Sequence, residues 1–147
     1  MASWKSNRHE ELHYLHLRHS AELPDISRHA PFKAVICVED TPNLERQHEI
    51  SEWLVEMGCR YVVTCGEDSA SWCDSVRKAN LAIYDIDTMD ERDFGMTTGH
   101  PHEPLRAVFW YAKKMAKHPK MKLDSCIVLH LGEQNRAAEY ELIYRRA

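Results

Sequence analysis

The chain has 147 residues, about the length of one domain, and its 44% hydrophobic and 29% charged residues are typical of a folded globular protein. A formal net charge of −4 disfavours a nucleic-acid partner, because sequence-independent binders usually carry a basic surface. No apolar run is long enough to span a bilayer or to act as a secretory signal, and five cysteines, an odd number, favour reduced thiols in the cytoplasm.

Two strands and a helix are predicted in the first half of the chain. Residues 33–40 form a continuous apolar run, which is typical of a strand buried on both faces. Thr41 and Pro42 suit the N-cap and first position of a helix whose apolar residues repeat at helical spacing until Gly58. Residues 59–66 predict the second strand.

The middle of the chain predicts a shorter helix, a third strand and a long irregular segment. Asp68 or Ser69 can cap the helix, and residues 81–86 have the composition of a strand. Residues 87–104 are rich in turn-forming residues, with a brief strand expected at 94–98. Long irregular segments are often functional, so this one is a candidate binding region.

An amphipathic helix is predicted over residues 105–116 and a fourth buried strand over 124–132. The two ends stay open at this point. Residues 12–17 fit an edge strand or a helix, and residues 137–147 also fit either structure, because their aromatic and aliphatic residues match both periodicities.

Alternating strands and helices predict the fold class: a single α/β domain over residues 1–147, built as a three-layer sandwich. Its sheet should be mainly parallel, with four or five strands and with helices on both faces. Residues 1–30 are interpreted as an N-terminal extension and 133–147 as a C-terminal tail.

Acidic residues follow the predicted strands. Glu39 and Asp40 leave the first strand, and Asp85 and Asp87 leave the third. In an open α/β sheet ligands collect at the carboxyl ends of the strands, and carboxylates that converge there suit Mg²⁺. The sequence therefore allows a magnesium site of these four residues. Equally, acids after strands cap helices and stay solvated in turns, with no further role.

The acids and their surroundings resemble two families. The run "AVICVEDTPNLERQHEISEWLVEMG" resembles the start of a two-component receiver domain, and "NLAIYDIDTMD" lies where that family carries its phospho-acceptor. This resemblance implies that Glu39 and Asp40 bind Mg²⁺ and that Asp85 accepts phosphate. The pattern Glu39, Asp85, Asp87 is also similar to the Toprim arrangement of nucleases and topoisomerases.

A third resemblance covers more of the chain. The runs "MTTGHPHEPLRAVFWYAKK", "SWCDSV" and "KAVICVED" resemble an uncharacterised family of small bacterial α/β proteins that carries a domain of unknown function. The resemblance implies a bacterial cytosolic domain and assigns no chemistry.

Histidines and a cysteine supply further candidates. His100 lies near hydroxyl residues in a segment rich in Gly and Pro, where it can serve as a general base, and His130 can face the same cleft. His9, His13 and His16 share one face in a helix, a spacing that binds transition metals, but His13 and His16 point apart in a strand. Cys65, at a strand end, has no CxxC partner and therefore no recognisable catalytic signature.

We therefore expect a small cytosolic, non-enzymatic protein-binding domain, immunity-like or regulatory, that neutralises or modulates a basic partner through an acidic surface. No cofactor is expected in this interpretation. Six residues are the predicted partner-binding set: Asp87, Asp90, Glu91, Asp93, Trp72 and Trp110.

The alternative is a Mg²⁺-dependent phosphoryl-transfer enzyme or phosphoesterase. Asp85 and His100 are its catalytic candidates, and the four carboxylates named above are its metal ligands. The sequence contains no P-loop, no dinucleotide fingerprint and no serine-hydrolase elbow, which disfavours nucleotide-dependent and serine-hydrolase chemistry.

Overall fold

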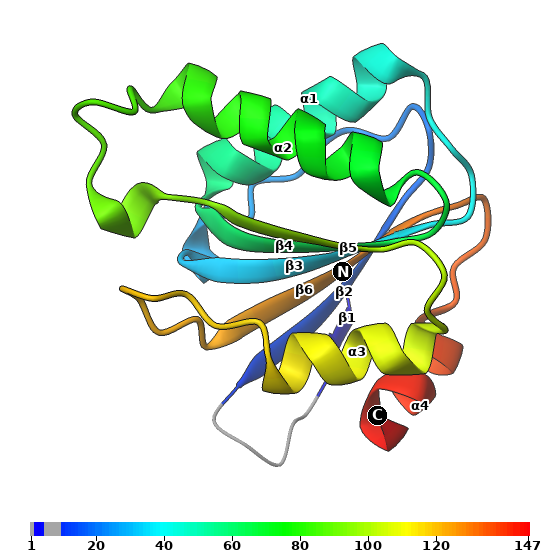
Figure 1. Cartoon of the computed structure of the whole chain (residues 1–147). Helices are drawn as coiled ribbons and strands as arrows, with labels where there is room; N and C mark the ends of the chain where they lie inside the picture. Colours follow the sequence, from blue (N-terminus) through cyan, green and yellow to red (C-terminus); the bar gives the residue numbers. More distant parts are fainter. Residues whose placement is uncertain (1, 5–9) are drawn as a thin grey trace.

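A six-stranded sheet forms the centre of the computed structural model, which describes residues 2–4 and 10–147 (Figure 1). Five strands are parallel, as predicted, and the short β1 adds to the sheet in the antiparallel direction. The strand order is β1-β2-β6-β3-β4-β5. The strands are β1 Ala2–Trp4, β2 Glu11–Leu17, β3 Phe32–Val38, β4 Cys59–Cys65, β5 Met96–His100 and β6 Ser125–Leu131.

Helices cover both faces of the sheet, so the predicted three-layer α/β sandwich is confirmed (Figure 1). One layer holds α1 (Leu44–Met57) and α2 (Ser69–Ile83), and the other holds α3 (Leu105–Lys114) and α4 (Ala137–Arg146). Two short 3₁₀ helices, η1 (Ser27–His29) and η2 (Glu91–Asp93), lie in connecting segments. Across the described part of the chain, none of the helices combines the length and apolar character needed to cross a bilayer.

The strand β3 shows why its sequence is continuously apolar. Phe32, Ala34 and Ile36 pack in the core beneath α1 and α2, whereas Val35 and Cys37 pack in the core beneath α3 and α4. All five are buried. Because successive side chains point to opposite faces, a central strand covered on both sides is almost wholly apolar, and Lys33, the one charged residue of β3, is buried with its ammonium bonded to the Ala112 carbonyl oxygen.

The helix α1 begins and ends at residues with specific capping chemistry. Asn43 is its N-cap, and the Asn43 side chain accepts a hydrogen bond from the Arg46 N–H at 2.8 Å, so the helix begins two residues after the predicted Pro42. Gly58 ends it, as predicted, with φ at 101° in the left-handed region that glycine adopts readily.

The predicted third strand at residues 81–86 is wrong, because α2 continues through this segment to Ile83. The short apolar run fitted either periodicity, and burial decides between them. Trp72, Val76 and Ala79 form the buried face of the helix, whereas Leu81 and Ile83 are exposed. The next strand is β5, Met96–His100, which starts two residues later than the brief strand that we expected at 94–98.

Both chain ends that the sequence left open join the fold. Residues 12–17 belong to β2, which pairs with β6 on one side and with β1 on the other, so β2 is no edge strand. The C-terminal segment is the helix α4. Tyr140 and Tyr144 are buried against α3 and the sheet, and this burial selects the helical periodicity.

Replacement of Gly58 by alanine should destabilise the protein. A Cβ at this position would lie 2.4 Å from the Ala30 Cβ and would also hold a strained left-handed backbone, which by itself costs about 1–2 kcal/mol. In urea unfolding, Gly58→Ala should lower the free energy of unfolding more than Gly66→Ala does. Gly66 has a similar φ of 106°, but a Cβ added there would lie 4.0 Å from its nearest neighbour. Equal losses would contradict the role of the Ala30 contact.

Candidate functional site

The carboxyl ends of the parallel strands carry a row of histidines and cysteines. Strand register places these residues side by side, one from each strand, at the same level of the sheet. The row is His16, His130, Cys37, Cys65 and His100, in the order β2, β6, β3, β4 and β5. Only the strand order, which the sequence does not give, brings them together.

His130 is the most highly connected member of this row. The Tyr14 hydroxyl lies 2.5 Å from its Nδ1, and the Glu39 carboxylate contacts its Nε2. The Arg136 N–H donates to the Tyr14 oxygen at 2.9 Å, and Arg136 Nε lies 2.9 Å from Glu39 Oε1. The Tyr140 hydroxyl donates to the same carboxylate at 3.3 Å. These contacts join β2, β3, β6 and the start of α4.

The hydrogen-bond partners determine the protonation of this network. An ionised Glu39 carboxylate can only accept, so His130 donates from Nε2 and its Nδ1 accepts from the Tyr14 hydroxyl. Burial lowers the pKa of His130 below its ordinary value, and Glu39 offsets only part of this change. Burial likewise raises the pKa of Tyr14. The stable state is therefore a neutral imidazole beside a protonated phenol.

This network is closed rather than open to a substrate. The His130 side chain is fully buried, and both of its ring nitrogens are engaged. A Cβ on Gly132 would lie 2.9 Å from His130 Nε2, so glycine allows the chain to pass close to the ring. Only Glu39 and Arg136 are partly exposed, at 38% and 40%. The arrangement positions α4 against the sheet.

The thiols of the row differ in ionisation. A hydrogen bond to Cys65 raises the pKa of Cys37, and the same bond lowers the pKa of Cys65. Cys65 is half-buried and also contacts the Ile36 carbonyl oxygen at 3.4 Å. Cys65 therefore carries the more acidic thiol of the pair, and Cys37 is buried in the core.

His100 ends β5 and is buried, whereas the sequence placed it in an irregular segment rich in Gly and Pro. Its Nδ1 contacts the Glu103 carboxylate, and its Nε2 lies 3.1 Å from the Thr98 hydroxyl. Its ring packs on Tyr111 at a centroid distance of 4.5 Å. The side chain thus connects β5 to α3, which makes it a positioning residue for that helix.

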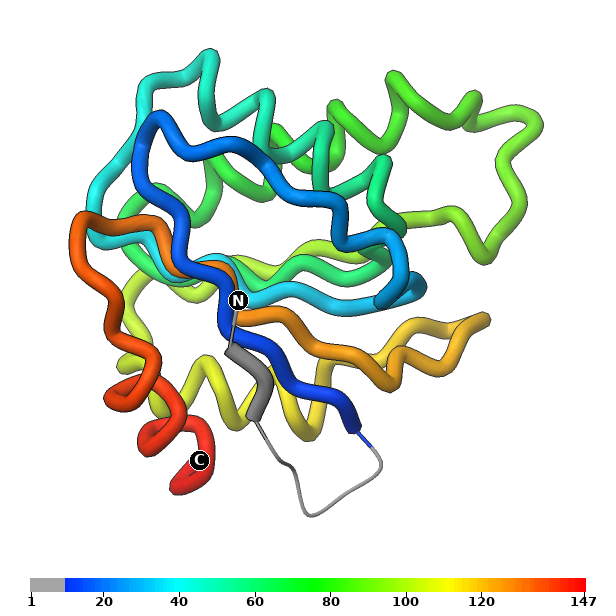
Figure 2. The backbone as a smooth tube through the Cα atoms, turned by 180° about the vertical axis from the view of Figure 1, so that it is seen from behind, coloured from blue at the N-terminus to red at the C-terminus, as the bar shows by residue number. Residues whose placement is uncertain are grey.

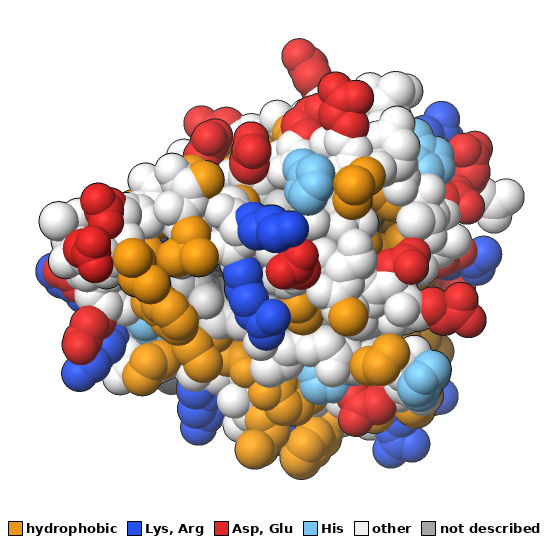
Figure 3. Space-filling model, turned by 45° about the horizontal axis from the view of Figure 1, so that its top comes forward, with side chains coloured by type: hydrophobic (Ala, Val, Ile, Leu, Met, Phe, Trp, Pro, Cys, Tyr) orange, Lys and Arg blue, Asp and Glu red, His pale blue; other side chains and the backbone are white. Residues whose placement is uncertain are grey.

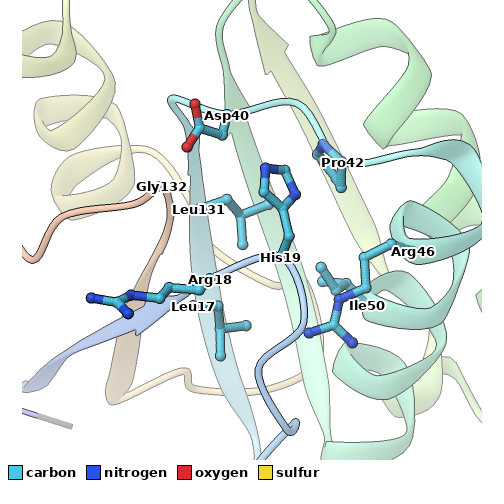
Figure 4. A pocket seen from close by; sticks show the side chains of 9 residues that line it. All are labelled: Leu17, Arg18, His19, Asp40, Pro42, Arg46, Ile50, Leu131 and Gly132. Atoms are coloured by element: carbon cyan, nitrogen blue, oxygen red, sulfur yellow. The ribbon is translucent and has the colours of Figure 1, made fainter.

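A small cavity lies beside the carboxyl edge on the α1 side (Figure 4). Asp40, His19 and Arg46 are among its lining side chains, and Arg46 also donates to Glu49 at 2.6 Å. The cavity measures about 10 Å³, which is room for about one water molecule. Asp40 therefore borders a water-sized space.

The four carboxylates of the predicted magnesium site do not assemble. Glu39 and Asp40 follow β3 at the carboxyl edge of the sheet. Asp85 and Asp87 follow α2, which runs back toward the amino edge, so these two acids lie at the opposite end of the molecule (Figure 1). The error arises from the strand wrongly predicted at residues 81–86. The receiver-like and Toprim-like patterns depended on that same strand.

In the described part of the chain, residues 2–4 and 10–147, one group has ligand atoms close enough to share an ion. It comprises Glu11, His13 and His29, whose ligand atoms all lie within 4.8 Å of one another. None of the four predicted carboxylates belongs to it.

The predicted partner-binding acids all lie in the connection between α2 and β5, residues 84–95, which is here named the acidic loop. Asp90 pairs with Arg92 at 3.3 Å, Glu91 with Lys120 at 3.2 Å, and Asp93 with Arg60 at 3.2 Å. These pairs neutralise part of the loop's charge.

Asp85 and Asp87 extend the negative surface of the acidic loop. Both are exposed, and among the described residues neither forms an ion pair. The Asp85 side chain accepts from the Asp87 N–H at 2.9 Å, which orders the turn.

The two predicted tryptophan anchors have different positions. Trp72 is 1% exposed in the core under α2, so it offers no surface to a partner. Trp110 is 49% exposed, but it lies on α3 in the other helical layer. Helical spacing puts Trp72 on the buried face of α2 and Trp110 on the outer face of α3. The spacing therefore argues against Trp72 as a partner-binding residue.

An apolar groove adjoins the acidic loop, and sequence reasoning missed it. Its volume is about 340 Å³. Leu81, Ile86 and Phe94 line it and are 50%, 67% and 46% exposed. Figure 3 shows apolar side chains gathered at this end of the molecule, at the left of the view. The remaining lining residues are Arg77, Asn80, Gly95, Met96 and Thr97.

A lysine-rich depression of about 450 Å³ lies between α3 and the following loop. Lys33, Lys113, Lys117 and Lys122 line it together with two acids. The Lys33 ammonium donates to the Ala112 carbonyl oxygen at 2.5 Å and pairs with Glu10 at 3.1 Å. The innermost of these lysines is therefore engaged within the protein.

Comparison with known proteins identifies a family and no activity. The family described as "Domain of unknown function (DUF7684)" matches residues 12–147, which is nearly the whole chain. Searches of curated proteins and of solved structures found no match.

Removal of the Tyr14 hydroxyl should destabilise the fold. In Tyr14→Phe the His130 Nδ1 and the Arg136 N–H lose their partner in a buried environment, which costs about 1–3 kcal/mol. Urea unfolding measures this decrease in the free energy of unfolding. Tyr84→Phe is the matched control, because the Arg60 guanidinium that donates to Tyr84 at 2.9 Å keeps Asp93 as a partner. Equal stability of Tyr14→Phe and the unaltered protein would contradict the network.

Stability should fall as the solution is acidified below neutrality. Unfolded histidine takes up a proton near pH 6.5, whereas folded His130, with its lowered pKa, stays neutral. The unfolded state then binds more protons, so the free energy of unfolding decreases as pH falls through about 6.5. NMR titration of the histidine ring protons provides the direct measurement. His130 should titrate below the ordinary histidine pKa of about 6.5, and a midpoint at or above that pH would contradict the neutral buried imidazole.

Proposed function

The chain belongs to the DUF7684 family, a domain of unknown function, and from its surface we propose that it is a non-enzymatic protein-binding domain. The binding site is the apolar groove together with the acidic loop and the free side of β5. Its partner is a basic protein segment that the domain neutralises or modulates, in the manner of an immunity or regulatory protein.

The apolar groove is the observation that carries this proposal. Leu81, Ile86 and Phe94 are large side chains that are about half exposed and gathered around one depression. Contiguous apolar surface of this kind is uncommon on a monomeric soluble protein and usually marks an interaction site. Leu44 is also exposed, but the other residues that line its depression are Glu45, His48, Glu49 and Glu52, all of them charged or polar.

The neighbouring strand offers backbone hydrogen bonds to the same partner. β5 is the last strand of the sheet over the described residues and pairs only with β4. Alternate N–H and C=O groups of such a strand point away from the sheet and can pair with an extended segment. Met96 and Thr97 belong to both β5 and the groove lining. A segment added to β5 would therefore place side chains in the groove.

The charge of the acidic loop favours a basic partner. Residues 85–93 contain five carboxylates and one guanidinium, a formal charge of −4, which equals the net charge of the entire chain. Lys120 and Arg60 compensate two of these acids, and Asp85 and Asp87 stay exposed at the rim. Rim charges mainly speed association and select the partner, while buried apolar contacts supply most of the affinity.

The enzymatic alternative has less support. Its magnesium ligands Glu39 and Asp40 lie at the opposite edge of the sheet from Asp85 and Asp87. Its general-base candidate His100 is buried and is engaged with Glu103 and Thr98.

We place the proposed binding function in the cytoplasm, since all five cysteines are free thiols and four of them are buried.

The proposal predicts selection of basic, extended peptides by the purified domain. A displayed library of random peptides should yield sequences with a positive net charge and alternating apolar residues. Truncation of a central apolar anchor typically costs about 2 kcal/mol, so Phe94→Ala and Ile86→Ala should each weaken a selected peptide roughly thirtyfold in calorimetry.

Two matched controls test the location of binding. Leu142→Ala removes an equally exposed side chain, at 50%, from α4 in the other layer, and should leave affinity unchanged. Asp87→Lys should slow association, whereas Glu52→Lys on α1 should alter it less. Selected peptides whose affinity is insensitive to Phe94→Ala and Ile86→Ala would contradict the proposal.

A further inference from the structure

Glu11, His13 and His29 form a compact group at the amino end of β2, far along the chain from any residue of the apolar groove. Glu11 and His13 are two residues apart on β2, so their side chains lie on the same face of the strand. His29 belongs to η1, in the segment that crosses the α1 side of the molecule before β3 (Figure 2). We propose that these three residues bind a divalent transition-metal ion, with zinc as the first candidate.

The spacing of the donor atoms is close to that of a zinc centre. His13 Nε2 lies 3.6 Å from Glu11 Oε2, and His29 Nδ1 lies 3.7 Å from the same oxygen. Zinc bonds of about 2.0–2.1 Å in a tetrahedron separate neighbouring ligand atoms by about 3.3–3.4 Å. The two distances to Glu11 exceed this separation by a few tenths of an ångström, and all three ligand atoms lie within 4.8 Å of one another, so rotation of the side chains would bring the group to ligand geometry.

The burial of His29 provides a second observation that points to a ligand. The His29 side chain is only 9% exposed, and its ring centroid lies 4.2 Å from that of His13, which is 8% exposed. His29 Nε2 is buried and has no hydrogen-bond partner among the described residues. No bond to Nε2 within the described residues therefore fixes the ring, and Nδ1, on the Glu11 side, is the nitrogen placed to bind an ion.

The chemistry of the donor set selects the class of ion. Two imidazole nitrogens and one carboxylate oxygen suit zinc and other first-row divalent metals better than Mg²⁺ or Ca²⁺, which prefer all-oxygen sites. Three protein ligands leave a fourth position for water. The Ser125 hydroxyl lies 3.4 Å from Glu11 Oε2 and can orient that carboxylate as an outer partner.

Binding would join two segments that are separate in sequence. The ion would connect β2 to η1 and so fix the crossing segment against the sheet. Of the two alternatives for His13 and His16, the strand holds: β2 places them on opposite faces, so they do not form the helical metal triad with His9. His9 lies outside the described residues. The site depends on His29, which is thirteen or more residues from every member of that triad.

Zinc titration of the protein, purified without a polyhistidine tag, tests the site. Calorimetry with zinc chloride should show one ion bound per chain, and the midpoint of thermal unfolding should rise with zinc. His13→Gln, His29→Gln and Glu11→Gln should each weaken binding at least about tenfold, since even outer-shell partners of a ligand change affinity by roughly 10- to 100-fold. Glu11 is 66% exposed, so Glu11→Gln leaves the packing of the core unchanged.

An exposed histidine provides the matched control. His19 lies close in sequence but is exposed and outside the group, so His19→Gln should bind zinc as the unaltered chain does. Substitution with Co²⁺ should give visible absorption bands that disappear in Glu11→Gln. Absence of stoichiometric binding, or an equal loss in His19→Gln and Glu11→Gln, would overturn the assignment. These outcomes are independent of whether peptides bind the apolar groove.

Discussion

The contact of the buried His130 ring with Tyr14 and Glu39 is the constraint on which the carboxyl half of this fold depends. A polar ring with no exposure is tolerated because both nitrogens have partners, Tyr14 in β2 and Glu39 directly after β3. Arg136 joins the same group and so fixes the start of α4. This edge is closed around His130, and the apolar groove lined by Leu81, Ile86 and Phe94 lies at the amino edge instead.

The helix α2 connects these two ends of the molecule. Its buried face, with Trp72 and Val76, packs on the sheet, and its last turn carries Leu81 beyond the covered region. The acidic loop then returns the chain to β5, and Asn80 holds that return through a hydrogen bond to the Asp93 carbonyl oxygen at 3.1 Å. The same connection therefore produces the groove, its acidic rim and the free strand edge.

The sequence predicted the elements whose pattern is long and unambiguous. The apolar run of β3, the helical spacing of apolar residues in α1 and its end at Gly58 all follow from local chemistry. Residues 81–86 could not be assigned, because six apolar-rich residues fit a helix end or a strand and only burial separates the two. That single error moved Asp85 and Asp87 to the wrong edge of the sheet. The row that includes His130 and Cys37 required the strand order, which no local pattern contains.

Hydrogen exchange of the backbone amides shows where a partner binds, and so tests protein binding through the apolar groove. With a basic, extended peptide bound, we expect slower exchange in β5, at Met96–His100, and in the acidic loop, with little change in β2 at the other side of the sheet. Unchanged exchange in β5, or protection confined to α3 and α4, would contradict it.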